Sequence, residues 1–316
     1  MGGSVAQSFI AGIDIGGTKT RIMLARGGNP VADRTLSTDS WRIREVETDG
    51  KELSGRLAAL CADEGLGAGA LAALVVGAHG CDTDEQCRAF QTSLARHLPG
   101  RVQVVNDAEL MGPAAGFFGG ISVVAGTGSI AVARAPEGRM LVAGGWGWIL
   151  GDEGSAPALV RDAAKAIRGA IDAGDSADPL TEALMSELGT DDPTMLGRLL
   201  NDTRSAVIWG RYANAVFAAA DAGSRLAQGV IVEGGAALAA LVGVLIKRGA
   251  DAASVVAGGG VIVEQPRLMA AFAAAMKKVS PDSAVVLLRE PPVMGALALA
   301  ERALPTEATL KARDRR

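Results

Sequence analysis

The chain has 316 residues, enough for two domains of ordinary size, and 49% of them are apolar, enough for sizeable cores. The net charge of −4 and the absence of a basic stripe in the sequence argue against a nucleic-acid-binding protein. The three cysteines, Cys61, Cys81 and Cys87, form no CxxC pair, which argues against zinc and disulfides and favours a reducing cytosol. Residues 1–8 lack the pattern of a signal peptide, and no uncharged run of about 18 apolar residues predicts a membrane span.

The first predicted element is a β-hairpin over residues 9–24, two apolar runs joined by a glycine turn. The turn, residues 15–20, contains two glycines whose backbone N–H groups can approach an anion closely. Thr18 and Thr20 add hydroxyls that suit phosphate oxygens, and Asp14 precedes the turn, where a carboxylate can hold a hydrated Mg²⁺. Taken alone, the stretch fits a phosphate-binding turn and an ordinary hairpin turn equally well.

The first half of the chain continues with alternating strands and helices. We expect strands over 31–38, 71–76 and 101–105 and helices over 49–64, 83–98 and 108–118. Asn106 and Asp107 directly follow a predicted strand, at the sheet edge where α/β proteins place ligands. His79 lies in the turn 77–82, and its surroundings favour a structural histidine over a ligand.

The second half of the chain repeats this pattern. A strand, a Gly-Thr-Gly-Ser turn at 126–129 and two more strands restart it, and a long helical stretch, 155–248, then departs from it. We expect strands over 121–125, 130–134, 140–143, 252–257 and 284–288, and helices over 266–279 and 292–303. This weak repeat predicts two related α/β halves that each offer a Gly-Thr hairpin to a cleft. A glycine turn followed by a strand also argues against a Rossmann site and a P-loop.

Five motifs carry a family resemblance that covers nearly the whole chain. They are DIGGTKT (14–20), NDA (106–108), GTGS (126–129), GGWGWILGDEGS (144–155) and AGGGV (257–261), and the fourth is the most specific. In this order they resemble the actin-like ATPase and sugar kinase superfamily, and within it the N-acetylglucosamine kinases grouped with the BadF/BadG/BcrA/BcrD ATPases. The resemblance implies an α/β fold of two ribonuclease H-like domains with an interdomain cleft and a helical insertion in the second. The domains would be 1–118 and 119–316, the final helix, about 292–304, packing back on the first domain.

The resemblance also implies roles for individual residues. Asp107 matches the catalytic base, which accepts the proton of the sugar hydroxyl, and Asp14 serves Mg²⁺ through water. The implied nucleotide-binding residues are Gly16, Gly17, Thr18, Lys19, Gly126, Thr127, Gly128, Gly258, Gly259 and Gly260. The implied sugar-binding residues are Asn106, Asp107, Ser129, Gly145, Trp146 and Asp152.

The activity implied by the resemblance is ATP-dependent phosphorylation of an amino sugar or hexose, with ATP and Mg²⁺, by a cytoplasmic homodimer. N-acetylglucosamine or glucosamine, phosphorylated at the 6-hydroxyl, is the expected substrate. The N-acetylglucosamine kinases that this chain resembles carry an asparagine after the GTGS turn. Here Ile130 stands at that position and cannot hydrogen-bond an acetamide, so glucosamine, glucose and other hexoses stay open.

Three other functions are alternatives to a sugar kinase. An activator ATPase of a 2-hydroxyacyl-CoA dehydratase holds an iron–sulfur cluster with cysteines, and the cysteines here do not match that arrangement. A non-catalytic sugar sensor or regulator carries a helix-turn-helix ahead of the ATPase domain, and a first strand beginning near Ser8 leaves no room for one. A chaperone-like or filament-forming ATPase needs no loop like 145–155.

Overall fold

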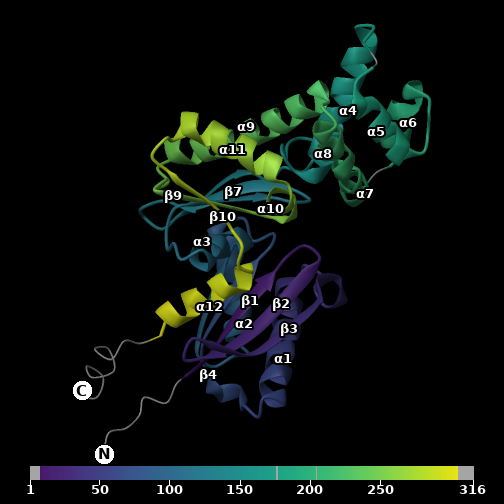
Figure 1. Ribbon diagram of the computed structural model, residues 1–316. Coiled ribbons are helices and arrows are strands. Elements are labelled where there is room, and N and C mark those ends of the chain that lie inside the picture. The colour runs from purple at the N-terminus through teal and green to yellow at the C-terminus, as the bar shows by residue number, and fades with distance from the viewer. Residues whose placement is uncertain (1–7, 176, 204, 305–316) are drawn as a thin grey trace, which may run out of the picture. The chain divides into compact units, whose positions relative to one another are not determined.

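The structure is a computed structural model that describes residues 8–175, 177–203 and 205–304 (Figure 1). The chain divides into two compact units. Unit 1 comprises the chain up to Phe118 together with the segment from Glu290 onward, and unit 2 comprises Gly119–Arg289. Each unit is built on its own five-stranded sheet, as the internal repeat predicts.

The sheet of unit 1 has the strand order β3-β2-β1-β4-β5. Its strands are β1 (Phe9–Ile15), β2 (Lys19–Arg26), β3 (Asn29–Ser37), β4 (Leu71–Ala78) and β5 (Arg101–Val105). The first three strands pair antiparallel through short turns, and β4 and β5 run parallel to β1. Strand β4 is apolar along its length and almost wholly buried, as expected for a strand covered on both faces.

The helices of unit 1 come from both ends of the chain. They are α1 (Val46–Asp63), α2 (Asp84–Ala95), α3 (Met111–Ala114) and α12 (Pro292–Arg302), with 3₁₀ turns η1 (Thr38–Ser40), η2 (Ala68–Ala70) and η3 (Asp107–Leu110). Helix α12 packs on β1 and β4 (Figure 1), where Val293 and Leu297 join a buried core with Val75. Gly12 permits this approach, because a Cβ there would lie 2.9 Å from Leu297 N. Gly295 lets α12 also approach η3, because a Cβ there would overlap Leu110 O.

The sheet of unit 2 repeats the topology of unit 1. Its order is β10-β9-β6-β7-β8, with three antiparallel strands followed by two strands parallel to the first. The strands are β6 (Ile121–Ala125), β7 (Ser129–Arg134), β8 (Met140–Gly144), β9 (Ser254–Gly258) and β10 (Ala284–Leu287). The weak sequence repeat therefore corresponds to two copies of one sheet architecture.

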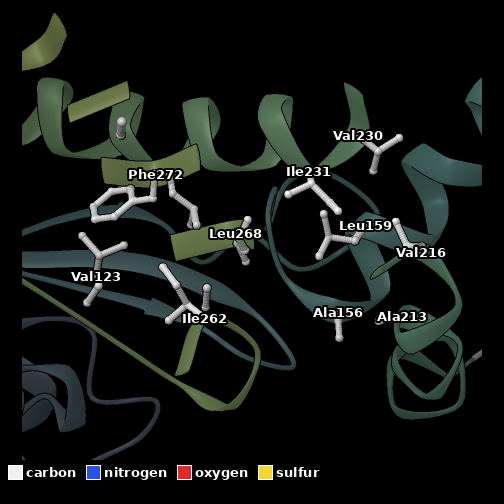
Figure 2. Packing of buried hydrophobic residues seen from close by; sticks show 14 of the residues in the cluster. Val123, Ala156, Leu159, Ala213, Val216, Val230, Ile231, Ile262, Leu268 and Phe272 are labelled. Atoms are coloured by element: carbon white, nitrogen blue, oxygen red, sulfur yellow. The ribbon is translucent and has the colours of Figure 1, made fainter. Parts of the chain in front are cut away.

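Helices cover the unit 2 sheet, and those that lie between β8 and β9 form a long insertion, while the last two follow β9. They are α4 (Ala156–Asp172), α5 (Pro179–Leu188), α6 (Leu196–Asp202), α7 (Ala206–Arg211), α8 (Ala213–Asp221), α9 (Arg225–Lys247), α10 (Gly260–Glu264) and α11 (Pro266–Val279), with the 3₁₀ turn η4 (Pro193–Met195). Figure 2 shows Phe272 and Leu268 of α11 beside Val123 of the sheet, in the same core as Ile231 of α9. Gly235 lets α9 and α11 touch, since a Cβ there would lie 2.6 Å from Phe272 N.

Helix α9 is long and apolar enough, by length and composition, to cross a membrane. The sequence search for an uncharged apolar run did not select it, because Glu233 interrupts the run. In the structure α9 packs on α11 and on β7 and β8, and its inward face, which includes Leu238 and Val242, is fully buried. The helix is therefore a core helix of unit 2.

Most predicted elements agree with the structure to within a few residues, and β5 and α11 have the predicted bounds. The predicted helix 108–118 is wrong in its length, because η3 and α3 end at Ala114 and Gly116 then adopts a φ of +86°. In the described residues of the helical stretch 155–248, the structure has six separate α-helices and the 3₁₀ turn η4. Left-handed glycines, among them Gly174, Gly189 and Gly223, separate several of them.

Candidate active site

Three residues at the turn between β1 and β2 are exposed, Gly17, Thr18 and Lys19. The turn is closed by a 2.9 Å hydrogen bond from Gly16 N to Lys19 O. Thr38 holds it from behind, since its Oγ1 donates to Gly16 O at 3.0 Å and its N donates to Thr18 O at 2.9 Å. The backbone of the turn is thus fixed at residues that are exposed, an arrangement that suits an anion.

Thr20 does not belong to the exposed part of this turn, contrary to the expectation that its hydroxyl faces phosphate. Its side chain is fully buried, and its Oγ1 lies 2.9 Å from Thr38 Oγ1. Trp41 Nε1 also donates to it at 3.1 Å. Thr20 therefore supports the turn from inside the unit.

Asp14 lies at the end of β1, where its carboxyl group is largely buried. Burial, and then the nearby charge of Asp107, raise the pKa of Asp14 to about 7, while Arg21 on β2 opposes the shift. A bound divalent cation would offset both of these costs. No group of three or more acidic, histidine or cysteine side chains that could hold a metal occurs among the described residues. This donor set fits Mg²⁺, which commonly takes one or two carboxylates and completes its shell with water and phosphate oxygens.

Asp107 begins η3 directly after β5, in the same sheet as Asp14. Its carboxylate Oδ2 lies 3.5 Å from Nδ1 of His79, and the Asp107 side chain is 27% exposed. A Cβ at Gly77 would lie 3.2 Å from the Asp107 Cα, so β4 and η3 approach closely here. Asp107 is thus held at the carboxyl edge of the sheet and remains accessible to a ligand.

Asn106 has a different environment from the one expected of a sugar-binding side chain. It is 1% exposed, and its Oδ1 accepts from Ala108 N at 3.0 Å. Its Nδ2 donates to Cys81 O at 3.2 Å and to Asp82 Oδ1 at 2.9 Å. Both amide protons are therefore committed within the protein, and the side chain links the turn 77–82 to η3.

The turn between β6 and β7 is the unit 2 counterpart of the turn in unit 1. Gly126 N donates to Gly128 O at 2.9 Å, and Ala156 N, at the start of α4, donates to Gly126 O at 2.9 Å. A Cβ at Gly126 would lie 3.6 Å from Gly260 N, so the predicted adenosine-binding turn is adjacent. Two glycine turns and the N-terminus of α4 converge here, an arrangement that favours phosphate.

Gly259 separates β9 from α10 and adopts a φ of +97°. A Cβ at this position would lie 2.6 Å from Ala125 O at the end of β6. Glycine is therefore required both by the backbone conformation and by the close approach of the two strands. Gly258 is buried at the end of β9, and Gly260 begins α10.

The loop after β8, residues 145–155, is folded around Asp152. This side chain is 7% exposed and its backbone has a φ of +53°. Its Oδ1 accepts from Gly147 N at 3.2 Å, and its Oδ2 would lie 3.0 Å from a Cβ at Gly128. Burial raises the pKa of Asp152, although hydrogen bonds from the backbone of Gly147 and Ser129 oppose the shift.

The other predicted sugar-binding residues differ in their exposure and in their hydrogen-bond partners. Ser129 is buried and its Oγ donates to Glu153 O at 2.8 Å, so its hydroxyl fastens the loop to β7. Gly145 has a φ of +75°, and its N donates to Ser129 O at 2.9 Å. The Trp146 side chain is 77% exposed. Trp146 thus offers an exposed aromatic surface to a ligand, and Ile149 and Leu150 of the same loop are exposed as well.

Arg161 of α4 holds this loop, although no sequence motif indicates this role. Its Nη1 donates to Trp148 O and, at 2.9 Å, to Gly151 O. Trp148 in turn packs on Trp209 with ring centroids 4.6 Å apart. Trp148 therefore serves packing, while its neighbour Trp146 is exposed. These contacts join the loop to α4 and to α7, which lie further along the chain, so a motif search cannot detect them.

Two sheets of the same order, each opening with a β-hairpin closed by a glycine turn, place this protein in the class of actin-like ATPases and sugar kinases. The chain belongs to the BadF/BadG/BcrA/BcrD ATPase family, whose sequence profile matches residues 11–300. The family and the fold inferred from the sequence motifs are thereby confirmed.

Three relatives show how far this likeness extends. An N-acetylmuramic acid/N-acetylglucosamine kinase from Clostridium acetobutylicum is 31% identical over 164 residues, which span 47% of this chain and half the length of that relative. The crystal structure of a candidate N-acetylglucosamine kinase from Chromobacterium violaceum is 26% identical, with a TM-score of 0.68 over 93% of this chain and 99% of that one. A ROK family glucokinase from Streptomyces griseus, solved with glucose and AMPPNP, shares the fold at 17% identity, with a TM-score of 0.58 over 93% of this chain and 99% of that one.

Proposed function

We propose that this protein is an ATP-dependent kinase of an amino sugar or hexose, with N-acetylglucosamine or glucosamine phosphorylated at the 6-hydroxyl. The observation that carries the proposal is the accessible carboxylate of Asp107 at the same sheet edge as Asp14 and the β1–β2 turn. A kinase of this kind needs a base for the acceptor hydroxyl beside groups that hold phosphate. The relatives named as N-acetylglucosamine kinases support the substrate class.

In the proposed reaction Asp107 accepts the proton of the sugar hydroxyl as its oxygen bonds to the γ-phosphorus. The bond from that phosphorus to the β–γ bridging oxygen breaks, and ADP leaves. The chain holds the phosphates with backbone N–H groups of Gly17 and Thr18 in unit 1 and of Thr127 and Gly128 in unit 2, while the N–H groups of Gly16 and Gly126 close the two turns. Gly258–Gly260 lies along the adenosine. Asp14 would hold Mg²⁺ through water, and the metal would supply neutralisation of the charge on the phosphate oxygens. Lys19, exposed beside the first turn, adds a positive charge.

The proposed sugar site is built by the loop 145–155. The Asp152 carboxylate accepts hydrogen bonds from two sugar hydroxyls, and exposed Trp146 packs on the apolar face of the ring. Gly145 contributes backbone groups, and Ser129 holds the loop in place through Glu153 O. Ile130 of β7, which lies against Gly145 at the start of the loop, determines whether an acetamide is accepted.

The experiment that tests the proposal measures ADP release with Mg-ATP against a panel of sugars. The panel contains glucosamine, N-acetylglucosamine, N-acetylmuramic acid, glucose, mannose and N-acetylmannosamine. We expect sugar-dependent ADP release with at least one amino sugar, and NMR of the product to place the phosphate on the 6-oxygen. ADP release that no sugar stimulates would contradict the proposal.

Two further parts of the proposal concern the assembly and its location. We expect the protein to act in the cytoplasm, as a homodimer. Sedimentation equilibrium of the purified protein measures the mass of the assembly directly. A mass equal to that of one 32.0 kDa chain at micromolar concentration would contradict the dimer.

A further inference from the structure

His79 lies in the part of unit 1 where the proposed reaction takes place, although the sequence favoured a structural role for it. In the sheet order β1-β4-β5 it directly follows the middle strand, β4. Asp14 is the next-to-last residue of β1 on one side, and Asp107 follows β5 on the other. The imidazole therefore comes from the strand between two carboxylates, where burial first and then the charge of Asp107 raise the pKa of Asp14.

The backbone of His79 is held on both sides. Its N donates to Ile15 O at 2.8 Å, which extends the pairing of β4 with β1 by one residue. Its O accepts from Arg42 Nη1 at 2.7 Å. The turn that follows is tied to Asn106, because Asn106 Nδ2 donates to Cys81 O and to Asp82 Oδ1. The histidine and Asp107 are thus carried by one connected frame.

The two edges of the His79 ring face different groups. Nδ1 lies 3.5 Å from Asp107 Oδ2, while Nε2 and Cδ2 would lie 3.8 Å from a Cβ at Gly17 in the β1–β2 turn. The side chain is 48% exposed, so it is not a core histidine satisfied by burial. A proton on Nδ1 directed at Oδ2 would leave the other oxygen of Asp107 for a substrate proton.

We propose that His79 is a positioning residue for Asp107, holding one carboxylate oxygen through Nδ1–H so that the other faces the acceptor hydroxyl. This inference rests on the proposed kinase function and assigns a role to a turn that the family motifs leave out. A catalytic base that is already held in one orientation avoids the entropic cost of being oriented during the reaction. For this hydrogen bond to form, the ring must carry a proton on Nδ1. The ring is therefore either the neutral Nδ1–H tautomer or the protonated imidazolium.

The charged groups around His79 favour its protonated form. The hydrogen bond to Asp107 raises the pKa of His79, and burial opposes this. The charges of Asp107 and of Asp82 in the same turn raise it further, while Arg44 lowers it. Protonated His79 would also offset part of the repulsion between Asp107 and Asp14. The pair therefore has a spectroscopic signature that does not depend on turnover.

The first test separates the two edges of the ring with three variants, His79→Ala, His79→Asn and His79→Gln. The amide nitrogen of asparagine can replace Nδ1–H, whereas that of glutamine reaches toward the position of Nε2–H. We expect His79→Ala to lower kcat roughly ten- to a hundredfold with the KM for ATP and sugar nearly unchanged. His79→Asn should recover most of the lost kcat, and His79→Gln should not. The thermal midpoint of each variant shows that it folds.

The second test measures the pair without any substrate. The chain has two histidines, so NMR titration of the imidazole signals is readily assigned with a His97→Gln variant, which also serves as the control for activity. In protein kept free of metal by EDTA, we expect Asp107→Asn to move the His79 titration to lower pH. An unchanged titration would overturn the proposal even if the protein proved to have no kinase activity.

The activity data can overturn it separately. A kcat for His79→Ala within twofold of the wild type would exclude a positioning role. Recovery by His79→Gln but not by His79→Asn would place the important contact on the Nε2 edge. Absence of sugar-dependent turnover in the wild type would instead contradict the proposed function. The NMR titration of His79 would then still test whether His79 and Asp107 interact.

Discussion

The side chain of Ile130 lies directly against Gly145, so that a Cβ at residue 145 would meet Ile130 Cδ1 at 3.0 Å. Ile130 also pairs with Gly144 across β7 and β8. An apolar side chain therefore stands where the loop 145–155 begins. In the proposed sugar site this contact puts a surface without hydrogen-bonding groups beside the sugar substituents.

The Ile130→Asn variant tests this arrangement. The amide of an asparagine side chain can hydrogen-bond an acetamide, and one such bond contributes about 1 kcal/mol. We expect the ratio of kcat/KM for N-acetylglucosamine over glucosamine to rise roughly two- to tenfold. Ile130→Val, which stays apolar, is the matched control. Equal changes in both variants would show that the effect comes from packing instead of the amide.

The Asp107→Asn variant tests the assignment of the base. Asparagine keeps the size of the side chain but cannot accept the proton of the sugar hydroxyl. We expect kcat to fall at least about a hundredfold. Calorimetry with a non-hydrolysable ATP analogue should show nucleotide binding close to that of the wild type. Near-normal turnover would remove Asp107 from the role of base.

Asp152→Asn tests the sugar site without changing the shape of the loop. Asparagine tolerates the φ of +53° at this position and still offers an acceptor to Gly147 N. Loss of charge-assisted hydrogen bonds to the sugar should raise its KM roughly ten- to a hundredfold. Glu153→Gln is the control, because the Glu153 side chain is 46% exposed and we assign it no contact with the sugar. A sugar KM that is unchanged in Asp152→Asn would exclude Asp152 from the site.

Gly259→Ala tests the turn between β9 and α10. The added Cβ would lie 2.6 Å from Ala125 O in a backbone conformation that disfavours side chains. We expect the free energy of unfolding in urea to fall by about 2 kcal/mol or more, and ATP affinity to fall with it. At Gly229 in α9 a Cβ would meet no atom within 4 Å. Gly229→Ala should therefore be neutral or stabilise by up to about 1 kcal/mol. A Gly259→Ala variant as stable as the Gly229→Ala control would contradict the predicted clash.

Asp178→Asn tests a contribution to stability that depends on pH. The Asp178 carboxylate accepts from Leu180 N in α5 and from Ser224 Oγ, Arg225 N and Leu226 N at the start of α9. Burial alone would raise the pKa of Asp178, but these hydrogen bonds outweigh it and hold the pKa below its usual value. The resulting stabilisation is therefore present above the pKa of the unfolded chain and is lost as the pH falls through the lower pKa of the folded protein.

At pH 7 we expect Asp178→Asn to lower the free energy of unfolding by about 1–2 kcal/mol. The difference from the wild type should shrink below about pH 4, where the carboxylate of the unfolded chain is protonated. Urea unfolding at several pH values measures both effects. A difference that does not change between pH 7 and pH 3 would show that the charge of Asp178 is not responsible.

The sequence was most informative where one segment determines its own structure. The strands of both sheets are short apolar runs between glycine turns, and the repeat of these runs predicts two sheets of one topology. The positions of Asp14 and Asp107 follow as well, because each residue stands at the end of a strand. The helix that contains α3 was predicted too long. It ends before Gly116, which adopts a left-handed conformation, and the sequence does not show at which of the several glycines in this segment the helix ends.

Roles set by partners far along the chain were not predictable. Thr20 and Asn106 carry polar side chains suited to ligands, yet Thr38 and the turn 77–82 engage them inside the unit. Arg161 and His79 have no motif, and only the fold brings them to Trp148 and Asp107. A local pattern cannot show which polar groups the protein satisfies itself and which it leaves for a substrate.

The packing of α12 on β1 and β4 has a consequence for synthesis of the protein. All of unit 2 precedes α12 in the chain, although α12 completes the core of unit 1. On the ribosome the sheet of unit 1 therefore emerges first and keeps an uncovered apolar face until the last helix has been made. Unit 2 is continuous in sequence, so every segment of its core has been synthesised before α12 is made. Chaperone dependence and misfolding during expression should therefore arise mainly in unit 1, the part of the protein that begins first and finishes last.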